Sequence, residues 1–421
     1  MSVLLNLAVA LVAGLLMTRL VKHWHLPDVT AFLIAGVLIG PFVLGRLGGI
    51  IGFADYDEVA KYDVISQVAM GFIAFSIGSE FRLSQLKKTG KAAFVIGVVQ
   101  SVIAVIMVDA ALIAFHFLFP EIISLPAAIT LGAIASATAP AATLMVVRQF
   151  KAKGELTDLL LPIVALDDAV GLVVFAVSFG IAKVMSSGEI NVLSIVLEPI
   201  IEIVCSLLLG VLAGYVLTKL EKLFHSNTNR NSLATSFVIF TAALATISAK
   251  AGPVTVGFSP LLTCMMLGTV FCNICDFSDE IMMRSEKWSS PVLACFFVLS
   301  GAALRLEVFG NYMLIILGAV YILSRSAGKY FGAKYSAKLM KCSPNVIKYL
   351  GITLLPQAGV ALGMCVTAQS LGKDGELIRN IILFSVLIYE LVGPLMTKKA
   401  LKAAGEIYEK PADKTARRKN A

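Results

Sequence analysis

Charged residues are scarce in this chain: only 15% of its 421 residues are Asp, Glu, Lys or Arg, whereas 58% are hydrophobic. Soluble globular domains usually carry about 25% charged and about 45–50% apolar residues. The mean hydropathy of +0.88 deviates in the same direction. The composition therefore excludes a large soluble core and predicts an all-α polytopic membrane protein. Apolar segments take up nearly the whole length, which leaves no room for a second soluble domain.

Histidine and paired cysteines are also scarce. The four His lie mostly in loops or at the ends of apolar segments, which argues against metal coordination by His. The seven Cys are scattered, and the pair Cys272 and Cys275 lacks the second Cys or His pair of a zinc site. No basic leader precedes the first apolar segment, so we expect this segment to be retained as a helix. We expect no cofactor, and no metal other than a transported cation.

About thirteen apolar segments have roughly the 17–25 residues that a membrane-spanning helix needs. They cover approximately residues 3–18, 29–45, 64–81, 92–118, 127–147, 159–182, 192–217, 233–250, 257–275, 289–305, 311–330, 347–370 and 378–397. Most Lys and Arg lie in alternate loops, on the side of the basic C-terminal tail. By the positive-inside rule the N-terminus is outside and the tail is cytoplasmic. The net charge of +8 then needs no nucleic-acid partner. The tail is interpreted as a solvated anchor, with binding to anionic lipid or to a partner as the alternative.

A faint internal repeat relates the two halves of the chain. Gly78, Arg82 and Leu83 recur 223 positions later as Gly301, Arg305 and Leu306, and residues 129–131 recur as residues 352–354. At an offset of 222, residues 168–171 resemble residues 390–393. The offset maps each span onto the seventh span after it, and this odd shift puts the two copies in opposite orientation. The pattern predicts two inverted-topology repeats, which are common in secondary transporters.

Two adjacent acids, Asp167 and Asp168, lie in the middle of the apolar segment 159–182. In a membrane-spanning helix both would lie about 13–15 Å from its start, close to the midplane. Each charged carboxylate costs at least ~2.5–3.5 kcal/mol there, so stability does not explain the pair. Carboxylate oxygens can hold a proton or a hard cation such as Na⁺, and successive helix residues face different partners. The pair indicates transport; buried acids satisfied by hydrogen bonds between packed helices are the alternative.

Two other spans are interrupted at corresponding positions of the two halves. Pro140 removes a backbone hydrogen bond from one, where Ser136 and Thr138 can bond the freed backbone or an ion. Pro356, followed by Gln357, interrupts the other. Ordinary proline kinks would explain either span alone. The matched pair predicts two crossing broken helices and a transport site between them.

Four further charged residues within spans are candidates for the site or its surroundings. Arg325 needs a counter-charge if it is buried, and the candidates are Asp167 and Glu390. We count Lys329 and Glu390 with Arg325 as supporting groups, although snorkelling of the side chain to the cytoplasmic face fits Lys329 better than Arg325. Packing alone is the alternative for Glu390. Asp109 is interpreted either as part of a proton path or as a group with a local hydrogen bond.

Two of these motifs carry a resemblance to a known family. The segment Thr138-Ala-Pro-Ala-Ala-Thr143, followed by Ala165-Leu-Asp-Asp-Ala-Val-Gly171, resembles the monovalent cation/proton antiporter superfamily. The similarity is to the bacterial sodium/proton antiporters, a branch related to the glutathione-gated potassium efflux transporters. The segment Leu26-Pro-Asp-Val-Thr30, leading to Gly36-Val-Leu-Ile-Gly-Pro41, is similar to the second helix of that branch. The resemblance covers nearly the whole chain up to the tail.

The resemblance implies a homodimer of thirteen-helix subunits, each with a dimerisation side and a mobile core. The corresponding segments are dimerisation-side residues 1–91 and 233–310, core residues 92–182 and 311–397, a linking helix within 183–232, and the tail 398–421. By the family motif Asp168 is the carrier of cation and proton, with Thr138 beside it. Asp167 pairs with a basic residue that falls on Arg325. Electrogenic members carry Lys there, and because Arg cannot usefully deprotonate, Arg favours electroneutral exchange.

The sequence thus predicts a Na⁺(or Li⁺)/H⁺ antiporter of a bacterial inner membrane, working by alternating access and serving pH homeostasis. Its expected partners are monovalent cations, protons, the lipid bilayer and a second copy of the chain. K⁺/H⁺ exchange is the alternative within transport; the gated potassium efflux relatives carry Gln-Asp instead of Asp-Asp and add a nucleotide-binding domain. A cation channel and an intramembrane aspartyl hydrolase are more distant alternatives. A hydrolase needs its two acids on separate helices facing one water, so we do not expect an enzyme.

Overall fold

The computed structural model describes residues 3–22, 28–45, 52–139, 143, 146–147, 150–186, 192–247, 249–251, 254–305, 310 and 312–407. The helices are α1 (Val3–Lys22), α2 (Asp28–Ile39), α3 (Tyr56–Ala60), α4 (Asp63–Glu80), α5 (Leu83–Leu118), α6 (Leu125–Ile134), α8 (Glu155–Ser186), α9 (Val192–Glu221), α10 (Asn227–Leu244), α11 (Pro260–Ile274), α12 (Ser278–Ala302), α13 (Tyr312–Leu339), α14 (Pro344–Thr353), α15 (Gly359–Ala368), the 3-10 turn η3 (Gln369–Leu371) and α16 (Lys373–Ala403). The two short strands β1 (Ala249–Ala251) and β2 (Val254–Val256) form an antiparallel pair. The architecture is otherwise helical, as the composition predicts.

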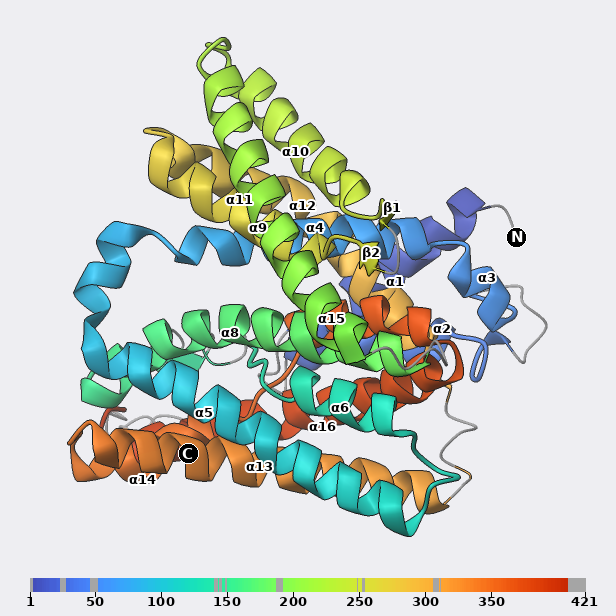
Figure 1. Ribbon diagram of the computed structural model, residues 1–421, viewed down its shortest axis with the longest axis vertical. Helices are drawn as coiled ribbons and strands as arrows, with labels where there is room; N and C mark the ends of the chain where they lie inside the picture. Colours follow the sequence, from blue (N-terminus) through green and yellow to red (C-terminus); the bar gives the residue numbers. More distant parts are fainter. Residues whose placement is uncertain are drawn as a thin grey trace, which may run out of the picture.

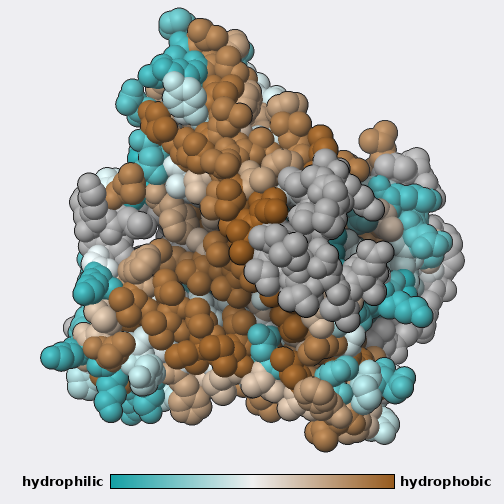
Figure 2. Space-filling view, viewed as in Figure 1, coloured by the Kyte–Doolittle hydropathy of each residue, from teal (hydrophilic) through white to brown (hydrophobic). Residues whose placement is uncertain are grey.

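Six of the described helices, α1, α5, α8, α9, α13 and α16, are long and apolar enough to cross a membrane. Five shorter apolar helices, α2, α4, α6, α11 and α15, accompany them. Large apolar side chains are exposed along single helix faces, as at Val204, Leu208 and Leu212 of α9. Hydrophobic residues also cover a broad central area of the face shown in Figure 2, with hydrophilic residues toward its periphery. This surface suits a lipid environment; the number of thirteen spans stays a prediction.

The helices form two groups (Figure 1). One group contains α5, α6, α8 and α13–α16, and the other contains α1–α4 and α10–α12, while α9 packs along α11 and reaches α8. Within the first group α5 and α13 lie side by side because Gly328 and Gly332 leave room for the other backbone. A Cβ atom at Gly328 would lie 2.7 Å from the Cα of Ala104. Small residues allow this close approach of helices, which is typical of membrane proteins.

Two segments of the first group are interrupted and meet each other. Helix α14 ends at Thr353 and α15 begins at Gly359, because Pro356 has no N–H to donate and disfavours helical backbone at the residue before it. Helix α6 ends at Ile134, and the backbone from residue 137 to 139 is not helical. The amide of Ala139 donates a hydrogen bond to the carbonyl of Pro356, at 2.9 Å. Pro140 lies outside the described residues, so its expected part in this break stays a prediction.

Helix α8 packs against the break that follows α6. A Cβ atom at Gly171 would lie 2.8 Å from the Oγ atom of Ser136, so glycine at this position allows the close contact. A buried hydrophobic cluster surrounds this region and joins the two groups, with Met70 from α4, Phe175 from α8 and Leu362 from α15 among its members. The break therefore lies in the interior, where polar side chains must find partners.

Candidate functional site

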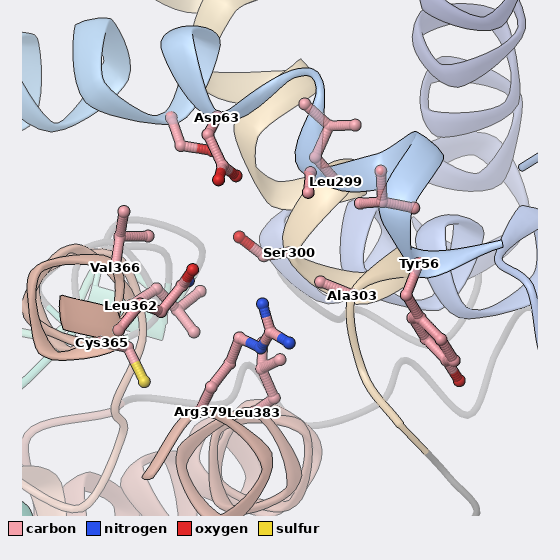
Figure 3. Close-up of a pocket in the computed structure, with 14 residues that line it drawn as sticks. Tyr56, Asp63, Leu299, Ser300, Ala303, Leu362, Cys365, Val366, Arg379 and Leu383 are labelled. Carbon is pink, nitrogen blue, oxygen red and sulfur yellow. The ribbon is translucent and has the colours of Figure 1, made fainter. Parts of the chain in front are cut away.

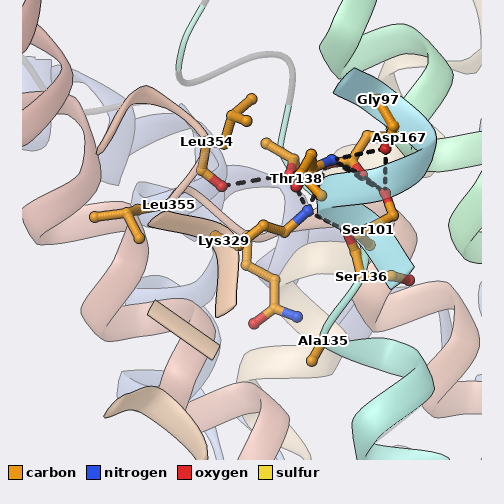
Figure 4. Close-up of polar contacts among 12 residues, drawn as sticks. Gly97, Ser101, Ala135, Ser136, Thr138, Asp167, Lys329, Leu354 and Leu355 are labelled. Carbon is orange, nitrogen blue, oxygen red and sulfur yellow. Dashed lines mark hydrogen bonds and ion pairs between the residues drawn. The ribbon is translucent and has the colours of Figure 1, made fainter. Parts of the chain in front are cut away.

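A buried ion pair lies at the centre of the first helix group. The Nζ atom of Lys329, on α13, lies 2.6 Å from the Oδ2 atom of Asp167, on α8 (Figure 4). Both side chains have 0% relative exposure. Two opposite charges can persist in such a place only when they compensate each other and their remaining polar atoms are bonded.

Three neutral side chains complete the environment of the Asp167 carboxylate. Gln100 donates from Nε2 to Oδ1 at 2.5 Å, and the neighbouring Ser101 hydroxyl donates to the same oxygen; both lie on α5. The Thr138 hydroxyl donates to Oδ2 from the break after α6. Two separate segments therefore direct donors at one carboxylate, in addition to the ammonium group of Lys329. Such a set stabilises the charged form of the acid.

Lys329 also holds the break after α6. Its ammonium group donates to the carbonyl of Ser136 and to the hydroxyl of Thr138, the latter at 3.0 Å. Thr138 thus touches both members of the ion pair and lies 3.4 Å from the carbonyl oxygen of Leu354 in the opposite break. Gln357 bridges the two breaks from the other direction, donating from Nε2 to the carbonyl of Ile134 at 3.0 Å.

Arg325 lies one helical turn before Lys329 on α13 and binds freed backbone carbonyls. Its Nε donates to Ala135 at 3.0 Å, its Nη2 to Ala137 at 2.6 Å, and its Nη1 to Leu355 at 2.7 Å. The guanidinium also covers the ring of Tyr389, with 4.5 Å from Cζ to the ring centroid. The interrupted helices expose carbonyls without intrahelical partners, and the planar fork of one Arg bonds three of them.

The expected pairing of Arg325 with Asp167 is therefore wrong. The ion-pair partner of Asp167 is Lys329, and the alternative in which Lys329 snorkels to the membrane surface is also wrong because its side chain is fully buried. Glu390 does not join the cluster around Arg325 either. It accepts a hydrogen bond from the hydroxyl of Thr30 on α2, at 3.3 Å. Breaks in two helices supply enough acceptors for Arg325 without a carboxylate, a packing detail that the motif does not reveal.

Two other acids bear on the site. Asp168 follows Asp167 in α8, but its side chain lies outside the described residues, so its role as carrier stays a prediction. Asp109 lies on α5 against Gly132 of α6, and its buried Oδ1 atom has no hydrogen-bond partner among the described residues. The interpretation of Asp109 as a group with a local hydrogen bond is not supported at this oxygen.

Gln100 and Ser101 were not predicted as site residues. The signal in the sequence that points to them is the presence of two successive polar residues in the middle of an apolar segment. Both of them bind Asp167. No group of three or more His, Cys, Asp or Glu that could hold a resident metal ion occurs in the part of the chain that the structure describes. The oxygen atoms gathered here are instead those of single acids, hydroxyls and freed carbonyls, which are ligands for hard cations.

The chain is similar to known antiporters in sequence and in fold. It is 23% identical over 354 residues to Na(+)/H(+) antiporter 1 of Methanocaldococcus jannaschii, covering 79% of this chain and 77% of that protein. It is 25% identical over 375 residues to the K(+)/H(+) antiporter subunit KhtU of Bacillus subtilis, covering 87% and 86%. The solved structure of the sodium proton antiporter MjNhaP1 from Methanocaldococcus jannaschii at pH 8 has a similar fold, with a TM-score of 0.69, 21% identity, and 94% and 97% coverage. The family model described as sodium/hydrogen exchanger, transmembrane, matches residues 7–403. The chain belongs to this sodium/hydrogen exchanger family of transmembrane proteins.

Proposed function

We propose that the protein exchanges Na⁺ or Li⁺ for H⁺ across a bacterial inner membrane by alternating access. The observation that carries this proposal is the buried Lys329–Asp167 pair at the point where two interrupted helices meet. A charged pair bonded by four further polar groups in an apolar interior is costly and is typical of an ion pathway. Broken helices near the midplane supply the free backbone groups that such transporters use to bind ions.

In this mechanism Asp168 binds either a cation or a proton, and Thr138 with carbonyls of the two breaks completes the cation shell. Asp167 remains tied to α5 and α13 through Gln100 and Lys329 and keeps the carrier region in position. Arg325 ties the two breaks together, so that they move as one body.

The two helix groups correspond to the moving parts of the proposed cycle. The first group, α5, α6, α8 and α13–α16, acts as the core, while α1–α4 and α10–α12 form the dimerisation side of a homodimer and α9 links the halves. The distribution of basic residues in the loops and tail favours an N-terminus outside and a C-terminus in the cytoplasm. Rocking of the core then exposes the occupied site to one side at a time.

The identity of the paired base bears on stoichiometry. The expectation of electroneutral exchange depended on Arg at this position, whereas Lys329 is the residue in contact with Asp167. A lysine ammonium can release a proton during a cycle, and a guanidinium cannot usefully do so. We therefore propose electrogenic exchange, in which more than one proton moves for each cation.

K⁺/H⁺ exchange is the second candidate, because the relative KhtU is named as a K(+)/H(+) antiporter subunit. The two candidates differ in the cation that collapses a pH gradient. Everted vesicles with a pH-sensitive dye, tested separately with Na⁺, Li⁺ and K⁺, distinguish them. Dequenching by Na⁺ or Li⁺ at concentrations where K⁺ has no effect supports the proposal, and the reverse order refutes it.

The role of Asp168 is tested in the same vesicles. We expect Asp168→Asn to abolish cation-driven proton movement while the protein still reaches the membrane in normal amount, because an amide cannot alternate between a proton and a cation. Asp158→Asn is a matched control on the same helix, since Asp158 is exposed in the first turn of α8. Retained exchange by the Asp168→Asn variant would contradict the assignment.

A further inference from the structure

At one level along the boundary between the two helix groups, a hydrogen bond joins the groups. The hydroxyl of Thr30, on α2 of the second group, donates to the Oε2 atom of Glu390, on α16 of the first group. Both residues are buried, at 0% and 1% relative exposure. The Oε1 atom of Glu390 has no partner among the described residues. Within the part of the chain that the structure describes, the one hydrogen bond of this buried carboxyl group therefore crosses between the two groups.

At another level along this boundary, a cavity separates the two helix groups. A cavity of about 60 Å³ lies between α3, α4 and α12 on one wall and α15, η3 and α16 on the other. Asp63 and Ser300 point into it from the second group, and Arg379 points into it from α16 (Figure 3). The cavity is thus lined by residues of both groups and changes whenever one group moves against the other.

Opposite charges face each other across this cavity without touching. Arg379 makes no ion pair within 4 Å of any described carboxylate, and no described residue accepts a hydrogen bond from its buried Nε atom. Asp63 likewise has no hydrogen bond or ion pair to a described residue. The Arg379 side chain is only partly buried and Asp63 is exposed. Their opposite charges attract each other, so closing the cavity would bring them together as an ion pair.

The two levels lie on the same helix. Arg379 and Glu390 are about 16 Å apart along α16 at a rise of 1.5 Å per residue. A rigid helix that tilts about a point between them would close one level as it opens the other. The Thr30–Glu390 contact and the Asp63–Arg379 gap therefore lie on opposite sides of the point about which α16 would tilt.

We propose that these two residue pairs form a two-position gate. In the conformation described here, the Thr30–Glu390 hydrogen bond closes one end of the boundary and leaves the cavity open at the other. In the alternate conformation Thr30 and Glu390 separate, and Asp63 and Arg379 form an ion pair that closes the cavity. This gate rests on the proposed alternating access, and it assigns to Glu390 a role in setting the balance of the two conformations.

The gate can be tested by labelling Ser300, which is partly exposed in the cavity wall. Ser300→Cys is introduced into a variant whose seven native Cys are replaced, and the rate of reaction with a membrane-impermeant maleimide is measured in proteoliposomes. One hydrogen bond of ordinary strength corresponds to roughly a 2–12-fold change in a conformational equilibrium. We expect Thr30→Val to slow labelling by at most about this factor, because the rate follows the population of the open form. Thr30→Ser, which keeps the hydroxyl, should leave the rate unchanged.

A second variant is expected to change the labelling rate in the opposite direction, which a general loss of stability in both variants would not do. We expect Asp63→Asn to raise the labelling rate or hold it at the maximum, because it removes the ion pair of the closed cavity. Labelling that is unchanged in Thr30→Val, or that changes in the same direction in both variants, overturns the gate.

A cross-link tests whether the closed end must open. With Thr30→Cys and Glu390→Cys together, oxidation is expected to stop exchange, and a reductant is expected to restore it, while each single variant is insensitive to oxidant. Exchange that continues through an intact cross-link overturns the gate. Absence of any cation-driven proton movement in the unmodified protein would instead refute the proposed function, because the labelling rates report on the boundary without transport.

Discussion

The structure predicts the effect of replacing Lys329 by Gln in most detail. The substitution removes the ammonium group that lies 2.6 Å from Asp167, and with it the bonds to the Ser136 carbonyl and the Thr138 hydroxyl. Asp167 keeps neutral donors but loses its counter-charge in a site with no exposure to solvent. The consequence should be a less stable protein, in addition to altered transport.

Breaking a buried ion pair by removing one partner costs about 3–5 kcal/mol, because the other charge remains buried and uncompensated. Removing both charges costs less, since no unpaired charge remains. The prediction is therefore non-additive: Lys329→Gln should destabilise more than the double variant Lys329→Gln with Asp167→Asn. For a chain of this length the single variant should lower the unfolding temperature by on the order of 3–6 °C.

The assay is thermal unfolding of the purified protein in detergent, followed by intrinsic fluorescence at one fixed heating rate. Lys338→Gln is the matched control, because Lys338 lies on the same helix and is exposed. The control should unfold within about a degree of the parent protein. If the single and double variants unfold at the same temperature, or if Lys329→Gln behaves like the control, the ion pair does not hold this site and the reasoning is refuted.

Two further predictions follow from side chains that bind backbone. Arg325→Lys should abolish cation-driven proton movement and lower the unfolding temperature. The reason is that an ammonium group cannot reach the carbonyls of Ala135, Ala137 and Leu355 together. A variant with normal flux in proteoliposomes would show that the guanidinium group is dispensable. Glu406→Gln should destabilise the protein by about 1–3 kcal/mol in the same unfolding assay. The Glu406 carboxylate accepts three hydrogen bonds at the first turn of α8, and the one from the Leu156 amide is 2.7 Å long. Unfolding at the parent temperature would contradict this role of Glu406.

The membrane class and the general location of the site could be predicted from the chain because they depend on local features. Long apolar runs are recorded directly in the composition, and the acids at positions 167 and 168 stand out against one of them. The family indicated by the acid pair is confirmed by the match over residues 7–403. The break at Pro356 follows from the chemistry of proline, which needs no tertiary information.

The partners of the buried charges could not be predicted in the same way. Arg325 and Lys329 lie four residues apart, on one face of α13, so periodicity does not say which of them meets Asp167. The answer depends on the carbonyls exposed by two breaks, and these depend on how α6 and α14 meet. The contact between Thr30 and Glu390 likewise joins positions far apart in the chain through packing that no local pattern encodes.

The central claim is that one buried carboxylate region is occupied in turn by a cation and by protons. The most direct measurement is equilibrium binding of radioactive ²²Na⁺ to the purified protein over a range of proton concentrations. We predict saturable binding that protons displace competitively, that Li⁺ also displaces, and that Asp168→Asn abolishes. Binding that persists in Asp168→Asn, or that protons reduce without changing the apparent affinity, would contradict the account.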